Sequence, residues 1–325
     1  MEYPLVSILV PIYGVEQYIE HCAVCLFEQT DSNIEYIFID DCTQDNSIGI
    51  LLNIILHYPS REQNIKIIHH EKNKGLAGAR NTAVAAASGE FVLHVDSDDY
   101  IEKNCVELLV AKQMETSADI VSGGIVCHKG NKEILWIPPR IDTSHEYCLK
   151  LIKRVTPVNI WGRLIKRNLY IENNLRTDEG TNMGEDYQII PRLVYYANKV
   201  SIVDNPLYHY IYANSGAYTN GFSEEKDNQV WKSFKVLYDF FENKGEKYVD
   251  ALNQGKIELL IGSIISSVNA GNYYYYRILR EMLDCCNNNN MPNLPLTKKI
   301  IVYISDYRIL RVYLKMAMEI KRLIG

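Results

Sequence analysis

Short apolar runs alternate with amphipathic stretches along the N-terminal part of the chain. Four runs have the length and composition of buried strands: Val6–Ile12, Tyr36–Ile39, Ile65–Ile68 and Phe91–Val95. Three intervening stretches carry apolar residues at helical spacing: Glu16–Gln29, Ser47–Tyr58 and Leu76–Ala87. This alternation predicts an α/β fold with a mostly parallel sheet, helices on both faces and right-handed crossovers. Ligands of such sheets bind beyond the carboxyl ends of the strands, so polar residues there should face one crevice.

The pattern loosens after residue 100 and becomes helical toward the C-terminus. Four further segments are expected to be strands, the last two of them as a pair of short strands: Ile120–Val126, Ile134–Ile137, Val200–Val203 and Leu207–Tyr212. Five segments have helical periodicity: Glu185–Ala197, Asn228–Asn243, Lys256–Val268, Tyr273–Cys286 and Tyr307–Ile324. We therefore expect an α/β domain over residues 1–220 and a mainly helical region over residues 221–325, interrupted by a polar linker at Asn287–Pro295.

Composition and charge narrow the class of protein. The 325 residues are 47% hydrophobic and 23% charged, which is ordinary for a globular protein with a sizeable core. A formal net charge of -6 argues against nucleic-acid binding, because such proteins usually need a basic surface to neutralise phosphates. The N-terminus lacks a secretory pattern, and no stretch reaches the roughly 18 apolar residues of a spanning helix. A cytoplasmic protein is expected.

The acidic cluster Asp96-Ser97-Asp98-Asp99 directly follows the strand Phe91–Val95. Alternate acids at a strand end can bend toward one pocket, and hard oxygen ligands suit Mg²⁺ or Mn²⁺. Such an ion would hold a diphosphate and stabilise its departure as a leaving group. The alternative is a solvated acidic turn without a ligand, which is common in proteins.

Two neighbouring strand ends also carry polar residues. Asp40 and Asp41 end the second strand, and Asn73–Asn81, which contains Gly75 and Arg80, leads from the third strand into its helix. A carboxylate can accept from the imide N–H of uracil or thymine or from ribose hydroxyls, Gly75 permits close backbone approach, and Arg80 could face phosphate. The alternative is that the two acids cap the next helix and that Arg80 lies on a solvated face.

These segments, in this order, resemble the family 2 glycosyltransferases, which have a GT-A fold. Val6–Tyr13 resembles the opening strand of the family, and Ile39–Ser47 resembles its VDDGSTDNS segment, with Cys42 in place of the glycine. Four further segments resemble the NxGxSxARN, GEY, DSDDY and WxKLY elements: Asn73–Asn81, Gly89–Phe91, Asp96–Tyr100 and Trp161–Ile165. Gly184–Tyr187 resembles the ED element. The resemblance covers roughly residues 5 to 215.

The resemblance implies a Rossmann-like mixed sheet flanked by helices, with a C-terminal helical appendage, and it implies roles for individual residues. The donor nucleotide would be bound by Pro11, Tyr13, Asp40, Asp41, Gly75, Arg80, Asp96 and Ser97. Asp98 would be the principal ligand of Mg²⁺ or Mn²⁺, with Asp96 and Asp99 assisting. Asp186 would be the catalytic base, at a helix start where backbone N–H groups stabilise negative charge. Alternatively, Glu185 and Asp186 only cap that helix.

Three further residues, His209, Trp161 and Glu185, are candidates for the site, and each also has a purely structural explanation. His209, in a stretch that resembles the LYxYR element of the family, could add a metal contact, although a histidine between tyrosines is more often packed. Trp161 is expected beside the acceptor cleft, where sugars stack on aromatic rings, although tryptophan is first a core residue. Glu185 is expected on the acceptor side as well.

The predicted activity is inverting sugar transfer from a nucleotide diphosphate donor, UDP- or dTDP-linked, to a hydroxyl acceptor. The motif set resembles that of bacterial enzymes, and this resemblance implies a role in surface polysaccharide or lipopolysaccharide assembly, with a saccharide or a lipid-linked saccharide as acceptor. Tyr307–Ile324 alternates cations with bulky apolar residues, which fits either helix packing or peripheral contact with the inner face of the cell membrane. The alternatives are a nucleotidyltransferase and a non-catalytic protein that binds sugar nucleotides.

Overall fold

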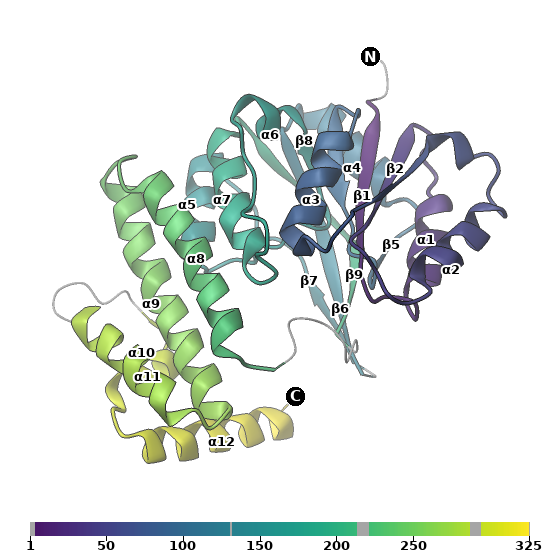
Figure 1. The fold of residues 1–325 in the computed structure, drawn as a ribbon. Coiled ribbons are helices and arrows are strands. Elements are labelled where there is room, and N and C mark those ends of the chain that lie inside the picture. Colours follow the sequence, from purple (N-terminus) through teal and green to yellow (C-terminus); the bar gives the residue numbers. More distant parts are fainter. Residues whose placement is uncertain (1–3, 131, 213–220, 287–293, 325) are drawn as a thin grey trace. The chain divides into compact units, whose positions relative to one another are not determined.

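The computed structural model describes residues 4–130, 132–212, 221–286 and 294–324 (Figure 1). The chain divides into two compact units. The first comprises Met1–Cys148 and Val158–Tyr218, and the second comprises Leu149–Pro157 and Thr219–Gly325. The domain limits expected from the sequence, 1–220 and 221–325, stay a prediction.

A mixed sheet forms the centre of the first unit. Within the described ranges it has nine strands: β1 (Val6–Ile12), β2 (Ile34–Asp40), β3 (Ile65–His69), β4 (Phe91–His94), β5 (Tyr100–Ile101), β6 (Ile120–Lys129), β7 (Lys132–Trp136), β8 (Arg163–Lys166) and β9 (Val200–Ile211). The order is β3-β2-β1-β4-β8-β6-β9-β5, and β7 pairs with β6. Strands β1 to β4 are parallel as predicted, whereas β8 runs antiparallel to both β4 and β6.

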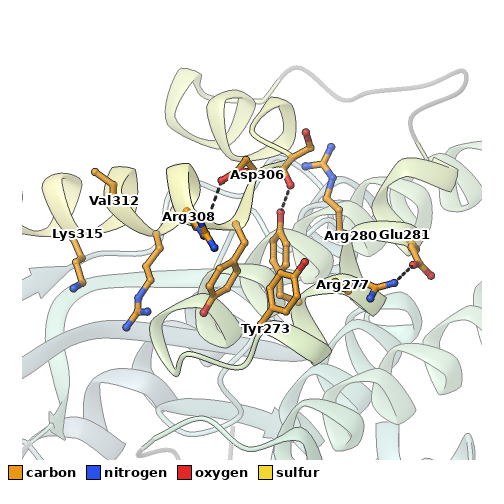
Figure 2. A pocket seen from close by; sticks show the side chains of 12 residues that line it. Tyr273, Arg277, Arg280, Glu281, Asp306, Arg308, Val312 and Lys315 are labelled. Atoms are coloured by element: carbon orange, nitrogen blue, oxygen red, sulfur yellow. Dashed lines mark hydrogen bonds and ion pairs between the residues drawn. The ribbon is translucent and has the colours of Figure 1, made fainter.

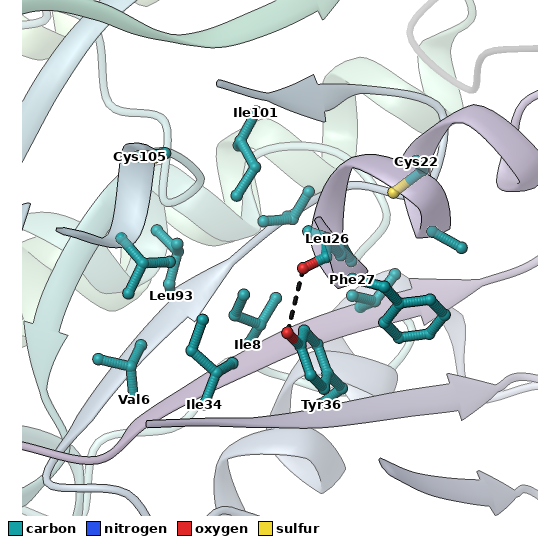
Figure 3. Close-up of a cluster of buried hydrophobic side chains, with 14 of the residues drawn as sticks. Val6, Ile8, Cys22, Leu26, Phe27, Ile34, Tyr36, Leu93, Ile101 and Cys105 are labelled. Atoms are coloured by element: carbon teal, nitrogen blue, oxygen red, sulfur yellow. Dashed lines mark hydrogen bonds between the residues drawn. The ribbon is translucent and has the colours of Figure 1, made fainter. Parts of the chain in front are cut away.

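Helices cover both faces of this sheet. Those of the first unit are α1 (Ile19–Phe27), α2 (Ser47–Ile55), α3 (Gly75–Ala86), α4 (Cys105–Thr116), α5 (Ser144–Ile152), α6 (Asn168–Glu172) and α7 (Glu185–Tyr196). Alternate residues of β1, beginning with Val6 and Ile8, pack with α1, α2 and α4 in one apolar cluster, in which the hydroxyl of Tyr36 donates to the carbonyl of Leu26 (Figure 3). Helix α3 contacts β1 and β2 from the opposite face.

The strand order reverses next to β1. The chain proceeds from β1 to β2 and β3 on one side, and then returns to place β4 on the other side of β1. In an open α/β sheet, ligands bind at such a reversal, beyond the carboxyl ends of the strands. Tyr13, Asp40 and Asp96 lie at the ends of β1, β2 and β4, respectively.

The prediction of two short strands at Val200–Val203 and Leu207–Tyr212 is wrong, because the structure has one strand, β9. The polar residues between the two runs suggested a turn, yet pairing with β6 continues through them with a shift in register. Close approach of the backbones permits this pairing, since a Cβ at Gly124 would lie 2.9 Å from the carbonyl oxygen of Asn205. Gly123 and Gly124 of β6 are the sequence signal for this irregularity, because glycine within a strand often marks a bulge or a close approach of two backbones.

The second unit is helical, as its periodicity predicted. It contains α8 (Glu224–Phe241), α9 (Glu246–Asn269), α10 (Tyr273–Cys286), α11 (Leu296–Tyr303) and α12 (Tyr307–Ile324), besides the end of α5. Helix α9 contacts each of the other four, and its residues Leu260, Ile261 and Ile264 lie at the centre of the apolar core. Most of the predicted linker Asn287–Pro295 lies outside the described residues. Among those that are described, no helix has the length and apolar character needed to span a bilayer.

The loop between β2 and α2 contains an unusual backbone conformation at Cys42. This residue has φ +60°, in the left-handed region that favours glycine, and its Sγ donates to the carbonyl oxygen of His70 at 2.8 Å. The substitution of cysteine for glycine, noted from the sequence, therefore falls where the backbone requires the conformation that glycine adopts most easily.

We expect Cys42→Gly to be more stable than Cys42→Ala, with a free energy of unfolding in urea that is about 1 kcal/mol higher. Both variants lose the thiol and its hydrogen bond, but only alanine retains the penalty of the left-handed region. Equal stabilities of the two variants would show that the backbone at this position relaxes out of that region.

Candidate functional site

Arg80 joins three carboxylates that are remote in the sequence. It lies in α3, and its side chain is only 4% exposed. Its Nη2 donates to Asp96 Oδ1 at 2.8 Å, and its Nη1 donates to Glu185 Oε1 at 2.5 Å and to Asp186 Oδ1 at 2.7 Å. One guanidinium thus connects the loop after β4 with the first turn of α7. A contact of Arg80 with phosphate stays a prediction.

Burial and charge act in opposite directions on this cluster. Burial disfavours the charged form of Arg80, but the neighbouring carboxylates, Asp96 foremost, raise its pKa well above the usual value. Burial raises the pKa of Asp186 to about 8, although Arg80 and a backbone hydrogen bond from Ile160 act to lower it. The Asp186 carboxyl is therefore poised to exchange its proton near neutral pH, as a general base requires.

Asp99 is fixed from two sides by the C-terminal part of β9. The hydroxyl of Tyr208 donates to Asp99 Oδ2 and the backbone N–H of Ile211 donates to Oδ1, both at 2.8 Å. Tyr208 also accepts from the backbone N–H of Asp96 at 3.1 Å. Burial, followed by the charges of Asp98 and Asp96, raises the pKa of Asp99 well above its usual value. Asp99 thus holds the acidic loop against β9, and its predicted help to a metal stays a prediction.

The remaining acids of the loop, Asp96 and Asp98, are only partly buried. Their charges converge, because both act on the pKa of the buried Asp99. Among the described residues, no group of three or more histidine, cysteine or acidic side chains is placed to hold a metal by itself. Carboxylate oxygens are the hard ligands that Mg²⁺ and Mn²⁺ prefer, and binding of such an ion by Asp96 and Asp98 stays a prediction.

Trp161 stacks on the strand that fixes the acidic loop. Its ring lies 4.4 Å from that of Tyr208 and 5.4 Å from that of Tyr210, between centroids, with interplanar angles of 22° and 4°. The tryptophan is half-buried, so part of its surface stays accessible beside the site. This position is compatible with both roles considered from the sequence, packing and acceptor contact.

His209 points into a different cluster, because it alternates with Tyr208 and Tyr210 along β9. Its Nε2 lies 2.8 Å from Glu102 Oε1, its Nδ1 lies 2.9 Å from His128 Nε2, and its ring stacks on Tyr100 with centroids 4.3 Å apart. Both ring nitrogens have partners in this arrangement. Metal binding by His209 stays a prediction that would require these bonds to be exchanged.

Asp40 and Asp41 organise the loops at the ends of β2 and β3. Both oxygens of the buried Asp41 accept hydrogen bonds from the turn that starts α3: Oδ1 from the Lys74 N–H and Oδ2 from the Gly75 N–H, each at 2.8 Å. Asp40, whose side chain is 14% exposed, accepts from the Thr43 N–H at 2.9 Å. Of the two acids predicted to bind the nucleotide, Asp40 is therefore the more accessible.

Gly75 is required by the protein's own packing. It has φ +75°, and a Cβ there would lie 2.3 Å from Asn182 Oδ1. That same oxygen accepts from the Leu76 N–H at 2.7 Å, which satisfies a free donor at the start of α3. The loop before α7 is thereby attached to α3, close in sequence to Arg80. An approach of the nucleotide to Gly75 stays a prediction.

The other predicted nucleotide-binding residues differ in accessibility. Tyr13, at the end of β1, is 57% exposed, whereas Ser97 is 4% exposed and Pro11 is buried within β1. Tyr13 is therefore the most accessible of the three for stacking on a base.

Sequence reasoning missed two residues that shape the site, Tyr208 and Asn182. The stretch around His209 was singled out, but strand alternation turns Tyr208, not His209, toward Asp99. A period of two along Leu207–Tyr212, combined with an acidic cluster in need of donors, would have indicated Tyr208. No local signal points to Asn182, because its role arises from contact with a helix start far away in the sequence.

Arg80→Met tests the importance of the shared cation. The substitution leaves three carboxyl groups of low exposure without their common partner, so the free energy of unfolding in urea should fall by about 3–5 kcal/mol. Since Arg80 lowers the pKa of Asp186, the loss should be greater near pH 8, where more of Asp186 is ionised, than near pH 5, where Asp186 is protonated. Arg176→Met, at an exposed position, is the control, and equal effects of the two substitutions would contradict the assignment.

Comparison with known proteins identifies the family of the chain. The model of the family described as Glycosyl transferase family 2 matches residues 7–179 of the chain. The uncharacterized glycosyltransferase EpsJ of Bacillus subtilis (strain 168) is 29% identical over 250 residues, which cover 74% of this chain and 71% of EpsJ.

Solved structures agree on the fold. TarS 1-349 of S. aureus, in complex with UDP-GlcNAc, has a TM-score of 0.60 at 19% identity, covering 89% of this chain and 94% of that one. The mannosyltransferase PcManGT of Pyrobaculum calidifontis, in complex with GDP-Man and Mn²⁺, has a TM-score of 0.56 at 16% identity, covering 99% and 88%. The sheet, its acidic edge and these matches lead to one assignment: the chain belongs to glycosyl transferase family 2 and is a glycosyltransferase with a GT-A fold.

Proposed function

We propose that this enzyme transfers a sugar from a UDP- or dTDP-linked donor to a hydroxyl acceptor with inversion at the anomeric carbon. The observation that carries the proposal is the pairing of Arg80 with Asp96 and Asp186, which fixes a loop suited to a diphosphate beside a carboxyl suited to a base. Structural neighbours hold UDP-GlcNAc and GDP-Man, so the fold by itself does not select the base. A pyrimidine is favoured because Asp40, at the end of β2, could accept from an imide N–H if its bond to His69 Nδ1 at 2.8 Å were exchanged.

The donor would lie along the carboxyl edge of the sheet. Tyr13 offers an exposed ring at the end of β1, and Asp40 offers a carboxylate at the end of β2. Asp96 would contact the ribose or the diphosphate while it stays paired with Arg80. In this arrangement Arg80 is a positioning residue, because it fixes the carboxylates that touch the reactants.

Asp186 would remove the acceptor proton. Direct displacement requires the acceptor hydroxyl on the face opposite the leaving diphosphate, and it requires a base within hydrogen-bonding reach as the new bond forms. Arg80 orients the Asp186 carboxyl, and the N-terminus of α7 stabilises its charge after it loses its own proton. Glu185 would assist on the acceptor side by completing the same ion-pair cluster.

Asp98 and Asp96 would hold Mg²⁺ or Mn²⁺ together with the donor. The bound cation supplies charge neutralisation for the departing nucleoside diphosphate. The structural neighbour PcManGT contains Mn²⁺, which supports a divalent metal. Two carboxylates supply too few ligands for such an ion. We therefore expect the metal to bind well only when the diphosphate supplies further oxygen ligands.

Asp98→Asn should abolish the effect of the metal on nucleotide binding. In the wild-type protein Mn²⁺ should strengthen UDP binding, which calorimetry measures directly and which a thermal shift follows by mass action. In the variant, UDP affinity should be the same with Mn²⁺ and with a chelator, and the transfer rate should fall by about 100-fold or more.

Asp204→Asn is the matched control, because Asp204 is an exposed acid of β9 away from the acidic loop. It should keep the full response to Mn²⁺. Wild-type transfer by Asp98→Asn, or nucleotide affinity that ignores chelators in the wild-type protein, would overturn the metal assignment.

The raised pKa of Asp186 predicts a pH dependence with a definite sign. Below about pH 8 the carboxyl is largely protonated and cannot act as a base, so kcat/KM should rise between about pH 6 and about pH 8 and then level off. An aspartate of ordinary pKa would give a flat profile over this range. Asp186→Asn should lower kcat by about 100- to 10,000-fold and remove the rise, while leaving UDP binding intact.

A panel of donors would test the activity as a whole. UDP-, dTDP- and GDP-sugars are incubated with Mn²⁺, and nucleotide release is measured with and without saccharide acceptors. Release of a nucleoside diphosphate supports sugar transfer, whereas release of pyrophosphate from a nucleoside triphosphate and a sugar phosphate would identify a nucleotidyltransferase. Tight donor binding without turnover by any acceptor would identify a binding protein.

The role that fits this activity is assembly of a cell-surface polysaccharide or lipopolysaccharide in the cytoplasm, with a saccharide or lipid-linked saccharide as acceptor. The relative EpsJ is named a glycosyltransferase, and the neighbour TarS holds UDP-GlcNAc, which supports a sugar nucleotide as donor. A lipid-linked acceptor would place the enzyme at the membrane surface, with Tyr307–Ile324 as the contact.

A further inference from the structure

The second unit contains a cleft of about 920 Å³ between α10 and α12 (Figure 2). Its lining is rich in cations, although the whole chain has a net charge of -6. The charged residues that line it are Arg277, Arg280, Arg308, Arg311, Lys315, Glu281 and Asp306. Arg277 pairs with Glu281 at 3.9 Å and Arg280 pairs with Asp284 at 2.8 Å, so the uncompensated positive charge comes from the cations of α12.

The cations of α12 are exposed and uncompensated. Arg308, Arg311 and Lys315 recur at intervals of three and four residues, so they share one face of the helix. Within the described part of the chain, none of these side chains forms an ion pair. Figure 2 shows Arg308 and Lys315 on α12, with Arg277 of α10 at the other end of the cleft.

The two acids of the cleft are already engaged. Asp306 Oδ1 accepts from the backbone N–H groups of Arg308 and Ile309 at 2.8 and 3.0 Å, which caps α12. Glu281 pairs with Arg277 at 3.9 Å, one turn earlier on α10. Neither acid is therefore placed to neutralise Arg311 or Lys315, and the positive charge on this side of the cleft faces solvent.

Aromatic contacts hold the two walls together. The hydroxyl of Tyr276 donates to the carbonyl oxygen of Ser305 at 2.8 Å, which links α10 to the turn before α12. The ring of Tyr307 lies 5.1 Å from those of both Tyr273 and Tyr276, between centroids. The cations are thus carried by a fixed framework, which lowers the entropic cost of binding an anion.

An exposed apolar stripe runs next to the cations on α12. Ile309, Val312 and Met316 are 61%, 58% and 56% exposed, whereas Leu310 and Leu314 are packed into the core. At helical spacing these three residues form a stripe that adjoins the one formed by Arg308, Arg311 and Lys315. Binding of a soluble anion would leave these apolar side chains exposed to water. A bilayer interface would bury them, while the neighbouring cations contact lipid phosphate.

We propose that the α10–α12 cleft binds the phosphate of an anionic lipid headgroup, with Ile309, Val312 and Met316 inserted into the adjoining bilayer interface. Charge complementarity selects the anion, and the exposed apolar stripe selects a lipid as its source. This inference deepens the membrane contact proposed above and rests on it. It is separable from the donor site, because every residue involved belongs to the second unit.

Vesicle binding by the full chain tests the proposal. The wild-type protein should sediment with vesicles of phosphatidylcholine mixed with phosphatidylglycerol, and much less with phosphatidylcholine alone. The triple variant Arg308→Gln, Arg311→Gln, Lys315→Gln should lose about a hundredfold in partition coefficient, since each cation near an anionic surface contributes about fivefold. A second variant, Ile309→Ser with Met316→Ser, should also bind the anionic vesicles more weakly, although its charge is unchanged.

The matched control is Lys232→Gln, Lys235→Gln, Lys247→Gln, which removes the same charge from exposed positions of α8 and α9 outside the cleft. Its vesicle binding should stay within a few-fold of the wild type. Circular dichroism checks that all variants are folded, and UDP binding with Mn²⁺ is measured in parallel. Normal UDP binding without vesicle binding would disprove the lipid site alone, whereas the reverse pattern would disprove the donor assignment.

Titration with inorganic phosphate separates the two sources of the anion. Weak binding of free phosphate combined with strong, charge-dependent binding to anionic vesicles supports the proposal. Free phosphate binding that the triple variant abolishes, without vesicle binding by the wild-type protein, would identify a site for soluble phosphate and overturn the lipid assignment. Equal loss of vesicle binding in the control variant would overturn it as well, because the attraction would then be nonspecific.

Discussion

A single buried guanidinium holds the candidate site together. Arg80 is almost fully shielded from water, and its charge is tolerable there only because Asp96, Glu185 and Asp186 surround it. Those acids are in turn costly to bury without it, so each side of the cluster requires the other. Because Arg80 is on α3 and its partners are on two other segments, the same interaction positions the loop after β4 against the start of α7. The catalytic geometry and the local stability therefore depend on one set of contacts.

This constraint divides the acids of the site into groups with different properties. Asp99 is enclosed by donors from β9 and anchors the loop, while Asp98 is only partly buried and its charge acts on the pKa of Asp99. Asp186 lies between these extremes, since burial raises its pKa and Arg80 limits the rise. The acidic loop and the distant start of α7 thus place their carboxyl groups in different environments, which suits them to the different roles proposed for them: an anchor, a metal ligand and a base.

The acidic loop of the first unit and the α10–α12 cleft of the second unit differ in the sign of their charge. The first unit gathers carboxylates at the edge of its sheet, which suits a metal–diphosphate ligand, whereas the second unit gathers cations in the α10–α12 cleft, which suits phosphate without a metal. A chain with a net charge of -6 has no general affinity for anionic surfaces, so attraction to them must come from a local cluster. Proximity of a lipid surface would also raise the local concentration of a lipid-linked acceptor, which connects the proposed lipid site to the proposed reaction.

The sequence by itself determined the alternation of strands and helices, the position of the acidic loop after β4 and the family, because these depend on periodicity and on short ordered motifs. It failed at β9, where polar residues suggested a turn but pairing with β6 continued. It also drew attention to His209 and not to Tyr208, and it did not reveal that Arg80 is buried among three carboxylates. Only the tertiary structure could decide these points, since the partner of a charged or hydroxyl group is chosen among segments far apart in the chain. Local sequence specifies which groups exist, whereas the energy of burying them together specifies which of them meet.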